Sequence, residues 1–200
     1  MSKISWVEWV ENKGTCLLET ERLILRKFVI EDAQLMYDNW TSRPEVSKTL
    51  SWFPAQNVEE TKELLREWID CYKNDDFYIW AIIRKETSEP IGSISATVKN
   101  KKFDEIEMGY AISDLYWGKG IATEALKAVI HFMLIDCKYN RVYAMHGTDN
   151  PASGRVMDKA GLQYEGVLRK VGKDKYGKYY DMSIHAITRD DLIEAEKKQN

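Results

Sequence analysis

Two glycines stand where a predicted strand meets a long predicted helix, and this junction constrains the fold more than any other feature. Residues 106–113 have the pattern of a strand, and residues 120–138 carry apolar side chains at the i, i+3, i+4 spacing of a buried helix face. Glycines at such a junction leave backbone N–H groups uncovered, and these groups attract anions together with the helix dipole. Gly118-Lys119-Gly120 therefore predicts a phosphate or pyrophosphate site on a domain that mixes strands and helices.

The common phosphate-binding motifs do not account for this loop. No Ser or Thr follows Lys119 and no second glycine stands at the P-loop distance, so the pattern is not G-x-x-x-x-G-K-[ST]. Position 123 is Thr, which excludes G-x-G-x-x-G. Because an isolated Gly-x-Gly before a helix is more often only a turn, the rest of the chain must decide what the loop binds.

Other segments supply that context. Trp117-x-x-Gly120-x-Ala122 resembles the pyrophosphate loop of the GNAT acetyltransferase superfamily, and Trp in place of the usual Gln or Arg is similar to its RimJ/RimL branch. Further segments resemble the same branch in the same order along the chain: Thr20–Arg26, Asn150–Ser153, Lys159–Leu162 and Tyr180–Asp181. The resemblance spans about residues 20–190, and it specifies the superfamily and the cofactor but not the acceptor.

The resemblance implies acetyl-CoA as co-substrate, with its pyrophosphate on the glycine loop. The residues expected in this cradle are Trp117, Gly118, Lys119, Gly120, Ile121, Ala122 and Thr123. Ile112 and Asn150 are expected to contact the pantetheine arm. Two of these residues have a plain structural alternative, since Lys119 also suits a solvent-facing helix start and Asn150 directly before Pro151 is a good helix N-cap.

Two side chains are candidates for catalysis. Glu107 lies in an otherwise apolar strand two residues before Gly109, and we expect it to act as general base, with Glu105 on the same face as its rival. Gly109 predicts a β-bulge that would free an N–H to polarise the thioester carbonyl. By resemblance, Ser153 assists the departing thiolate, although a serine at this helix position also makes local backbone bonds.

The order of predicted elements gives an α/β (α+β) domain with a mixed, mainly antiparallel sheet flanked by helices. The resemblance implies a split between the fourth and fifth strands of the superfamily, here residues 105–113 and 141–148. Residues 1–18 are expected to form an extension with a short helix carrying Trp6, Trp9 and Val10, residues 19–190 the acetyltransferase domain, and residues 191–200 a polar helical tail. The remaining strands are expected at 21–28, 77–85, 90–99, 163–171 and 178–187, and the remaining helices at 31–40, 57–72 and 151–160.

Composition narrows the functional class. A net charge of −3 gives no sign of nucleic-acid binding. The chain has no signal-peptide pattern and no apolar run long enough for a membrane span, so a cytoplasmic protein without membrane contact is expected. Cys16, Cys71 and Cys137 are odd in number and widely separated, which indicates free thiols, and the histidines show no metal-ligand spacing. The sequence leaves open a monomer or a homodimer.

Three functions remain. The first is transfer of an acetyl group from acetyl-CoA to a protein N-terminal α-amine, as the resemblance implies, by direct attack in a ternary complex because no cysteine is placed for an acetyl-enzyme. The second has a small amine as acceptor, and the third is an acyl-CoA-binding module without turnover. Aromatic or charged residues that could line an acceptor pocket are Trp40, Trp52, Phe53, Tyr179 and Asp181.

Overall fold

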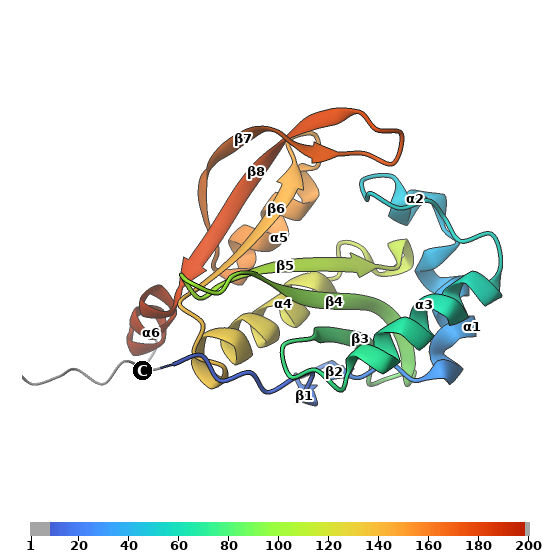
Figure 1. Ribbon diagram of the computed structural model, residues 1–200, viewed down its shortest axis with the longest axis horizontal. Helices are drawn as coiled ribbons and strands as arrows, with labels where there is room; N and C mark the ends of the chain where they lie inside the picture. Colours follow the sequence, from blue (N-terminus) through green and yellow to red (C-terminus); the bar gives the residue numbers. More distant parts are fainter. Residues whose placement is uncertain (1–8, 199–200) are drawn as a thin grey trace, which may run out of the picture.

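The computed structural model describes residues 9–198 and places their strands in one eight-stranded sheet (Figure 1). The strand order is β1-β2-β3-β4-β5-β6-β8-β7, and β5–β6 is the parallel pair. The strands are β1 (Leu18–Glu19), β2 (Leu23–Arg26), β3 (Tyr78–Arg84), β4 (Glu89–Asn100), β5 (Glu105–Ile112), β6 (Arg141–Gly147), β7 (Gln163–Lys173) and β8 (Tyr179–Thr188). The helices are α1 (Ala33–Met36), α2 (Pro44–Ser47), α3 (Val58–Cys71), α4 (Ile121–His131), α5 (Pro151–Ala160) and α6 (Arg189–Lys197). The mixed, mainly antiparallel fold is confirmed.

Helices cover both faces of the sheet (Figure 1). α4 and α5 pack on one face, where Leu126 and Val129 of α4 lie in the main core. α1 and α3 pack on the other face, over the β2–β4 half, in a second core that includes Trp40 and Leu65. We call these the α4/α5 face and the α1/α3 face. No helix in residues 9–198 is long and apolar enough to cross a membrane.

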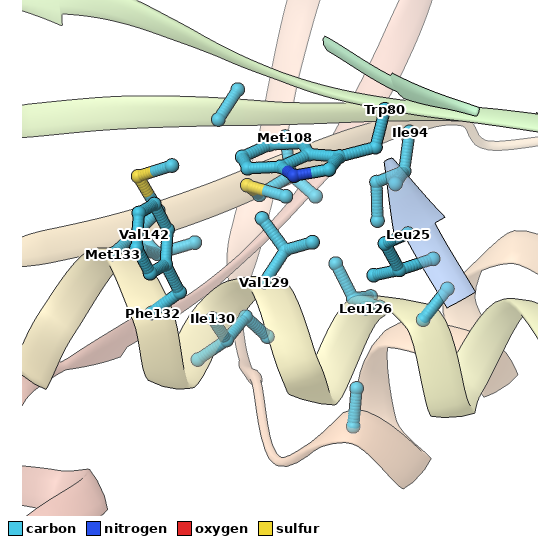
Figure 2. Packing of buried hydrophobic residues seen from close by; sticks show 14 of the residues in the cluster. Leu25, Trp80, Ile94, Met108, Leu126, Val129, Ile130, Phe132, Met133 and Val142 are labelled. Carbon is cyan, nitrogen blue, oxygen red and sulfur yellow. The ribbon is translucent and has the colours of Figure 1, made fainter. Parts of the chain in front are cut away.

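β3 joins the two cores because both of its faces are buried. Its side chains alternate, with Tyr78, Trp80 and Ile82 in the main core and Ile79, Ala81 and Ile83 in the second. Figure 2 shows Trp80 above the apolar side of α4, close to Val129. A strand buried on both faces reads as a continuous apolar run, as residues 78–83 do.

Helix ends match local signals in the sequence. α5 begins at Pro151 after the N-cap Asn150 and ends at Gly161, whose φ of 99° lies in the left-handed region. Asn57 caps α3 by accepting a bond from the Glu60 N–H. α4 extends into a five-residue π turn, η4 (Phe132–Asp136), so the long predicted helix is present with an irregular end.

The segment before β1 is not helical where it is described. Residues 9–17 contain no helix, and Trp9 is 77% exposed, so the expected short helix was wrong there; Trp6 lies outside the described residues. Instead, the Asn12 side-chain oxygen accepts bonds from the Tyr78 and Tyr139 hydroxyls at 3.0 and 2.8 Å. These bonds tie the segment to the main core.

Candidate active site

The sheet opens between β5 and β6. Their parallel pairing ends at Met108 and Ala144, after which β5 continues beside β4 and β6 continues beside β8. The two strands separate visibly beyond this point in Figure 1. The split that the resemblance implied is therefore confirmed in this structure.

Gly109 does not form a bulge. Gly109 pairs with Ser95 in continuous register, and the irregularity between β4 and β5 lies between Val98 and Asn100. The predicted bulge was wrong because β5 keeps its register with β4 here, and the sheet opens only where the pairing with β6 ends. A free strand edge results without any extra residue in β5.

The opened edge of β5 presents backbone donors. The Ser113 N–H donates to the Ile91 carbonyl on β4 at 2.9 Å, and successive residues direct their backbone groups to opposite edges of a strand. The N–H groups of Tyr110 and Ile112 therefore point toward the split. Because the β6 pairing has ended at Met108, the Tyr110 N–H is the first such donor available to a ligand.

The glycine loop has the geometry of an anion cradle. Gly118 and Gly120 adopt φ values of 73° and 77°, which favour glycine, and both are exposed. Gly120 is the N-cap of α4 and has no side chain to occupy the first N–H groups of the helix. The N–H groups of Ile121, Ala122 and Thr123 are those that a helix start leaves without an intrahelical partner. These groups fit the pyrophosphate of acetyl-CoA.

Trp117 and Lys119 shape the rim of this cradle. The Trp117 Nε1 donates to the Ile112 carbonyl at 2.9 Å, while the residue as a whole is 54% exposed. The Ile112 carbonyl is thus occupied, which leaves the Ile112 N–H for the pantetheine arm. The Lys119 Nζ lies 5.2 Å from the centre of the Tyr116 ring, so its side chain is held at the loop surface.

The candidate bases lie on the α1/α3 face in ion pairs. Glu107 pairs with Lys99 at 2.8 Å, and its side chain is 22% exposed. Glu105 pairs with Arg141 at 2.6 Å, and Arg141 also contacts Glu165. Glu105 and Glu165 therefore share one guanidinium.

Glu107 also lies beside Tyr143 of β6, its partner in the parallel register. Burial raises the pKa of Tyr143 to about 12, and the nearby charges of Glu107 and Glu105 add to the effect. Tyr143 therefore stays a neutral donor beside the carboxylates at neutral pH.

Asn150 and Ser153 form one hydrogen-bonded unit at the start of α5, on the α4/α5 face. The Asn150 Oδ1 accepts from the Ser153 N–H at 3.4 Å, and its Nδ2 donates to the Ser153 Oγ at 3.0 Å. Asn150 thus serves as the N-cap. Because Ser153 Oγ accepts this bond, its own hydroxyl proton remains free to donate.

The sequence did not single out the side chain of Tyr110 or that of Arg22. The Tyr110 hydroxyl donates to the Ser153 carbonyl at 3.4 Å and bridges β5 and α5 across the split; burial raises its pKa to about 12. Arg22 belongs to the Thr20–Arg26 motif but had no role assigned, and it contacts the Lys119 carbonyl and Glu124.

In residues 9–198, no group of three or more His, Cys, Asp and Glu side chains could hold a metal ion.

Comparison with known proteins assigns the family. A family model described as an acetyltransferase (GNAT) domain matches residues 22–163. The chain is 31% identical over 172 residues to the uncharacterized N-acetyltransferase p20 of Bacillus licheniformis, covering 86% of this chain and 96% of the relative. It is 25% identical over 158 residues to the ribosomal protein uS5-alanine N-acetyltransferase of Escherichia coli, with coverage of 76% and 80%. The structure of a GNAT acetyltransferase from Bacillus anthracis matches with a TM-score of 0.77 at 23% identity, covering 88% and 99%.

The family match extends over well more than half of the chain and contains the glycine loop, both split strands and α5. The relatives are covered over nearly their whole length, so the likeness concerns the complete domain. The chain belongs to the GNAT acetyltransferase family, in agreement with its resemblance to the RimJ/RimL-like branch, and is an acetyl-CoA-dependent N-acetyltransferase.

Proposed function

We propose that this enzyme acetylates the α-amine of a protein or peptide N-terminus by direct attack in a ternary complex. The observation that carries the proposal is the opened β5 edge, with Glu107 on one face of the sheet and the Asn150–Ser153 unit on the other. An amine approaching from the α1/α3 face would meet a thioester whose sulfur lies toward α5. The name of the Escherichia coli relative, which specifies an alanine of ribosomal protein uS5, supports the acceptor class.

Acetyl-CoA supplies an acetyl thioester, and the amine nitrogen bonds to its carbonyl carbon as the carbon–sulfur bond breaks. Glu107 accepts the proton that the nitrogen loses, directly or through water. Lys99 occupies this carboxylate at 2.8 Å, so it must move aside when the acceptor binds. An α-amine, with an ordinary pKa of about 8, is easier for the base to deprotonate than a lysine side chain, whose pKa is about 10.4.

Donors on both sides of the split complete the mechanism. The Tyr110 N–H would donate to the thioester carbonyl oxygen, which gains negative charge during the attack, as an oxyanion donor does. The free hydroxyl proton of Ser153 stabilises the departing thiolate by a hydrogen bond, and the positive end of α5 adds to this effect. Asn150 holds the hydroxyl in place from the other side.

The cysteines favour direct transfer over an acetyl-enzyme. None of Cys16, Cys71 and Cys137 lies on β5, β6 or α5. Cys137 is buried, and burial raises the pKa of its thiol to about 11, which keeps it protonated and unreactive at neutral pH.

Two distant segments meet over the proposed acceptor entrance. Lys175 in the β7–β8 hairpin donates to the Ser47 carbonyl at 2.9 Å, and Tyr176 packs edge-on against Phe53 with ring centres 5.5 Å apart. Figure 1 shows this hairpin reaching toward α2. We place the acceptor chain beneath this bridge, so that only a narrow chain end reaches Glu107.

The other expected pocket residues divide between the core and the surface. Trp40 is buried in the second core and cannot line a pocket, whereas Tyr179 is 56% exposed. Asp181 accepts a bond from the Lys170 N–H at 3.1 Å and pairs with the Lys170 Nζ at 3.2 Å. Its role is therefore structural, since it holds the irregular part of β7.

Replacing Glu107 with Gln should lower kcat by about 100-fold or more, because an amide cannot take the proton from the amine. Acetyl-CoA affinity should stay nearly unchanged, since Glu107 lies on the opposite face of the sheet from the glycine loop. Steady-state kinetics from pH 6 to pH 9 with calorimetric titration of acetyl-CoA separates the two effects.

Glu105→Gln is the matched control, because it removes a carboxylate from the same strand and face. Its kcat should change far less than that of Glu107→Gln. If turnover by Glu107→Gln equals that of the wild type across this pH range, Glu107 has no part in proton transfer. A reversed order of the two variants would assign the base to Glu105.

A further inference from the structure

Arg22, just before β2, is bonded to the glycine loop and to the first turn of α4. Its Nη1 donates to the Lys119 carbonyl at 2.9 Å, and its Nε and Nη2 each lie 2.6 Å from the Glu124 Oε2. The other Glu124 oxygen accepts from the Arg22 N–H at 2.9 Å and from the Thr20 hydroxyl at 2.6 Å. One guanidinium thus joins the peptide directly before Gly120 to the helix whose N–H groups form the cradle.

The contact lies directly against the loop. A Cβ placed on Gly120 would be 3.4 Å from the Arg22 Nη2. The Lys119 carbonyl that Arg22 holds belongs to the same peptide group as the Gly120 N–H, so the bond fixes the direction of that N–H. A loop with glycines on both sides of Lys119 would otherwise have wide backbone freedom.

Charge gives Arg22 a second effect. Glu124 lies in the first turn of α4, where an unpaired carboxylate would repel a bound pyrophosphate. Burial opposes ionisation of Glu124, but bonds from Thr20 and Arg22 outweigh it and lower the pKa, so the group is charged at neutral pH. The Arg22 guanidinium, with two nitrogens against one Glu124 oxygen, supplies the counter-charge within the cradle.

We infer that Arg22 is a positioning residue of the pyrophosphate cradle, one that selects donors carrying a pyrophosphate. It orients the Lys119–Gly120 peptide and neutralises Glu124, and neither effect reaches the pantetheine portion of the donor in the β5–β6 split. The inference rests on the proposed placement of acetyl-CoA on this loop. It gives the Thr20–Arg26 motif a function in donor selectivity.

The test compares two donors that differ in the pyrophosphate. Equilibrium dialysis measures binding of radiolabelled acetyl-CoA and of radiolabelled S-acetylpantetheine to the wild type and to Arg22→Met. Acetyl-CoA affinity should fall about tenfold or more, as expected for losing charge-assisted bonds, while S-acetylpantetheine affinity stays within about twofold. Destabilisation alone would weaken both ligands together, so the ratio of affinities isolates the positioning role.

Two further variants separate the positioning role of Arg22 from a general effect of substitution on folding. Arg22→Lys keeps the positive charge but lacks the fork that reaches both Glu124 and the Lys119 carbonyl, so its loss for acetyl-CoA should be intermediate. Lys85→Met is the control at a neighbouring cation in the β3–β4 turn, because Lys85 binds the Thr20 carbonyl at 2.8 Å and Glu19 at 3.1 Å instead of the loop. It should bind both donors as the wild type does.

Unchanged acetyl-CoA affinity in Arg22→Met, or an equal loss for both donors, would overturn the inference. Wild-type protein that binds S-acetylpantetheine and acetyl-CoA equally would also overturn it, because the pyrophosphate would then contribute nothing at the loop. Failure of the wild type to bind either donor would instead remove the proposed donor site itself. The two failures are therefore distinguishable.

Discussion

Gly120→Glu should weaken acetyl-CoA binding by about 100-fold or more, which in calorimetric titration amounts to no detectable heat at ordinary concentrations. The substitution places a carboxylate at the N-cap of α4, where the pyrophosphate is expected to lie. It also forces a non-glycine residue to adopt a φ of 77°, at a cost of about 1–3 kcal/mol. That strain lowers the stability of the free and the bound protein alike, so the loss of affinity comes from repulsion between the new charge and the pyrophosphate.

Gly177→Glu is the matched control for this prediction. Gly177 has a φ of 87° and is exposed in the β7–β8 hairpin, so the same substitution brings similar backbone strain and the same charge far from the loop along the chain. It should bind acetyl-CoA with wild-type affinity. Equal loss in both variants, or strong binding by Gly120→Glu, would show that the donor does not lie on the glycine loop.

Trp80→Ala should lower the free energy of unfolding by about 3–5 kcal/mol, as expected for removing a large aromatic side chain from a packed core. Trp80 has no exposed surface, and its ring packs against Tyr78 and Phe132, each with ring centres 6.0 Å away. Its Nε1 also donates to the Cys16 carbonyl at 2.6 Å, and the substitution leaves that acceptor without this partner. Urea unfolding followed by circular dichroism measures the change.

The loss is a large fraction of the 5–15 kcal/mol that usually separates folded from unfolded protein. Trp9→Ala serves as the control, because Trp9 is 77% exposed and its removal should change the free energy of unfolding by less than about 0.5 kcal/mol. A loss of less than about 1 kcal/mol for Trp80→Ala would contradict the account of β3 as the strand that joins both cores.

Local signals predicted the elements that depend on local physics. α5 was predicted from Pro151 to Ala160 and has these bounds, because proline fits the first helical turn and Gly161 fits the left-handed end. The cradle was predicted for the same reason, since two glycines before an amphipathic helix determine which N–H groups stay uncovered.

Features that depend on distant contacts were missed. Gly109 suggested a bulge, whereas the split arises where the β5–β6 pairing ends at Met108 and Ala144 while each strand stays paired with its other neighbour. Arg22 and Glu124 are 102 residues apart, and neither sequence neighbourhood indicates that they meet. The ion pair of Glu107 with Lys99 likewise depends on the register between β4 and β5.

The most direct test of the central claim is whether the wild-type protein releases coenzyme A thiol from acetyl-CoA in the presence of an amine. Thiol release would be followed with a disulfide reagent for a peptide with a free N-terminus, for the same peptide blocked at that amine, and for a panel of small amines. The account predicts release with the free peptide, none with the blocked one, and one acetyl group on its α-amine by mass spectrometry. Release with small amines alone would contradict the proposed acceptor, and acetyl-CoA binding without release for any amine would contradict the enzyme itself.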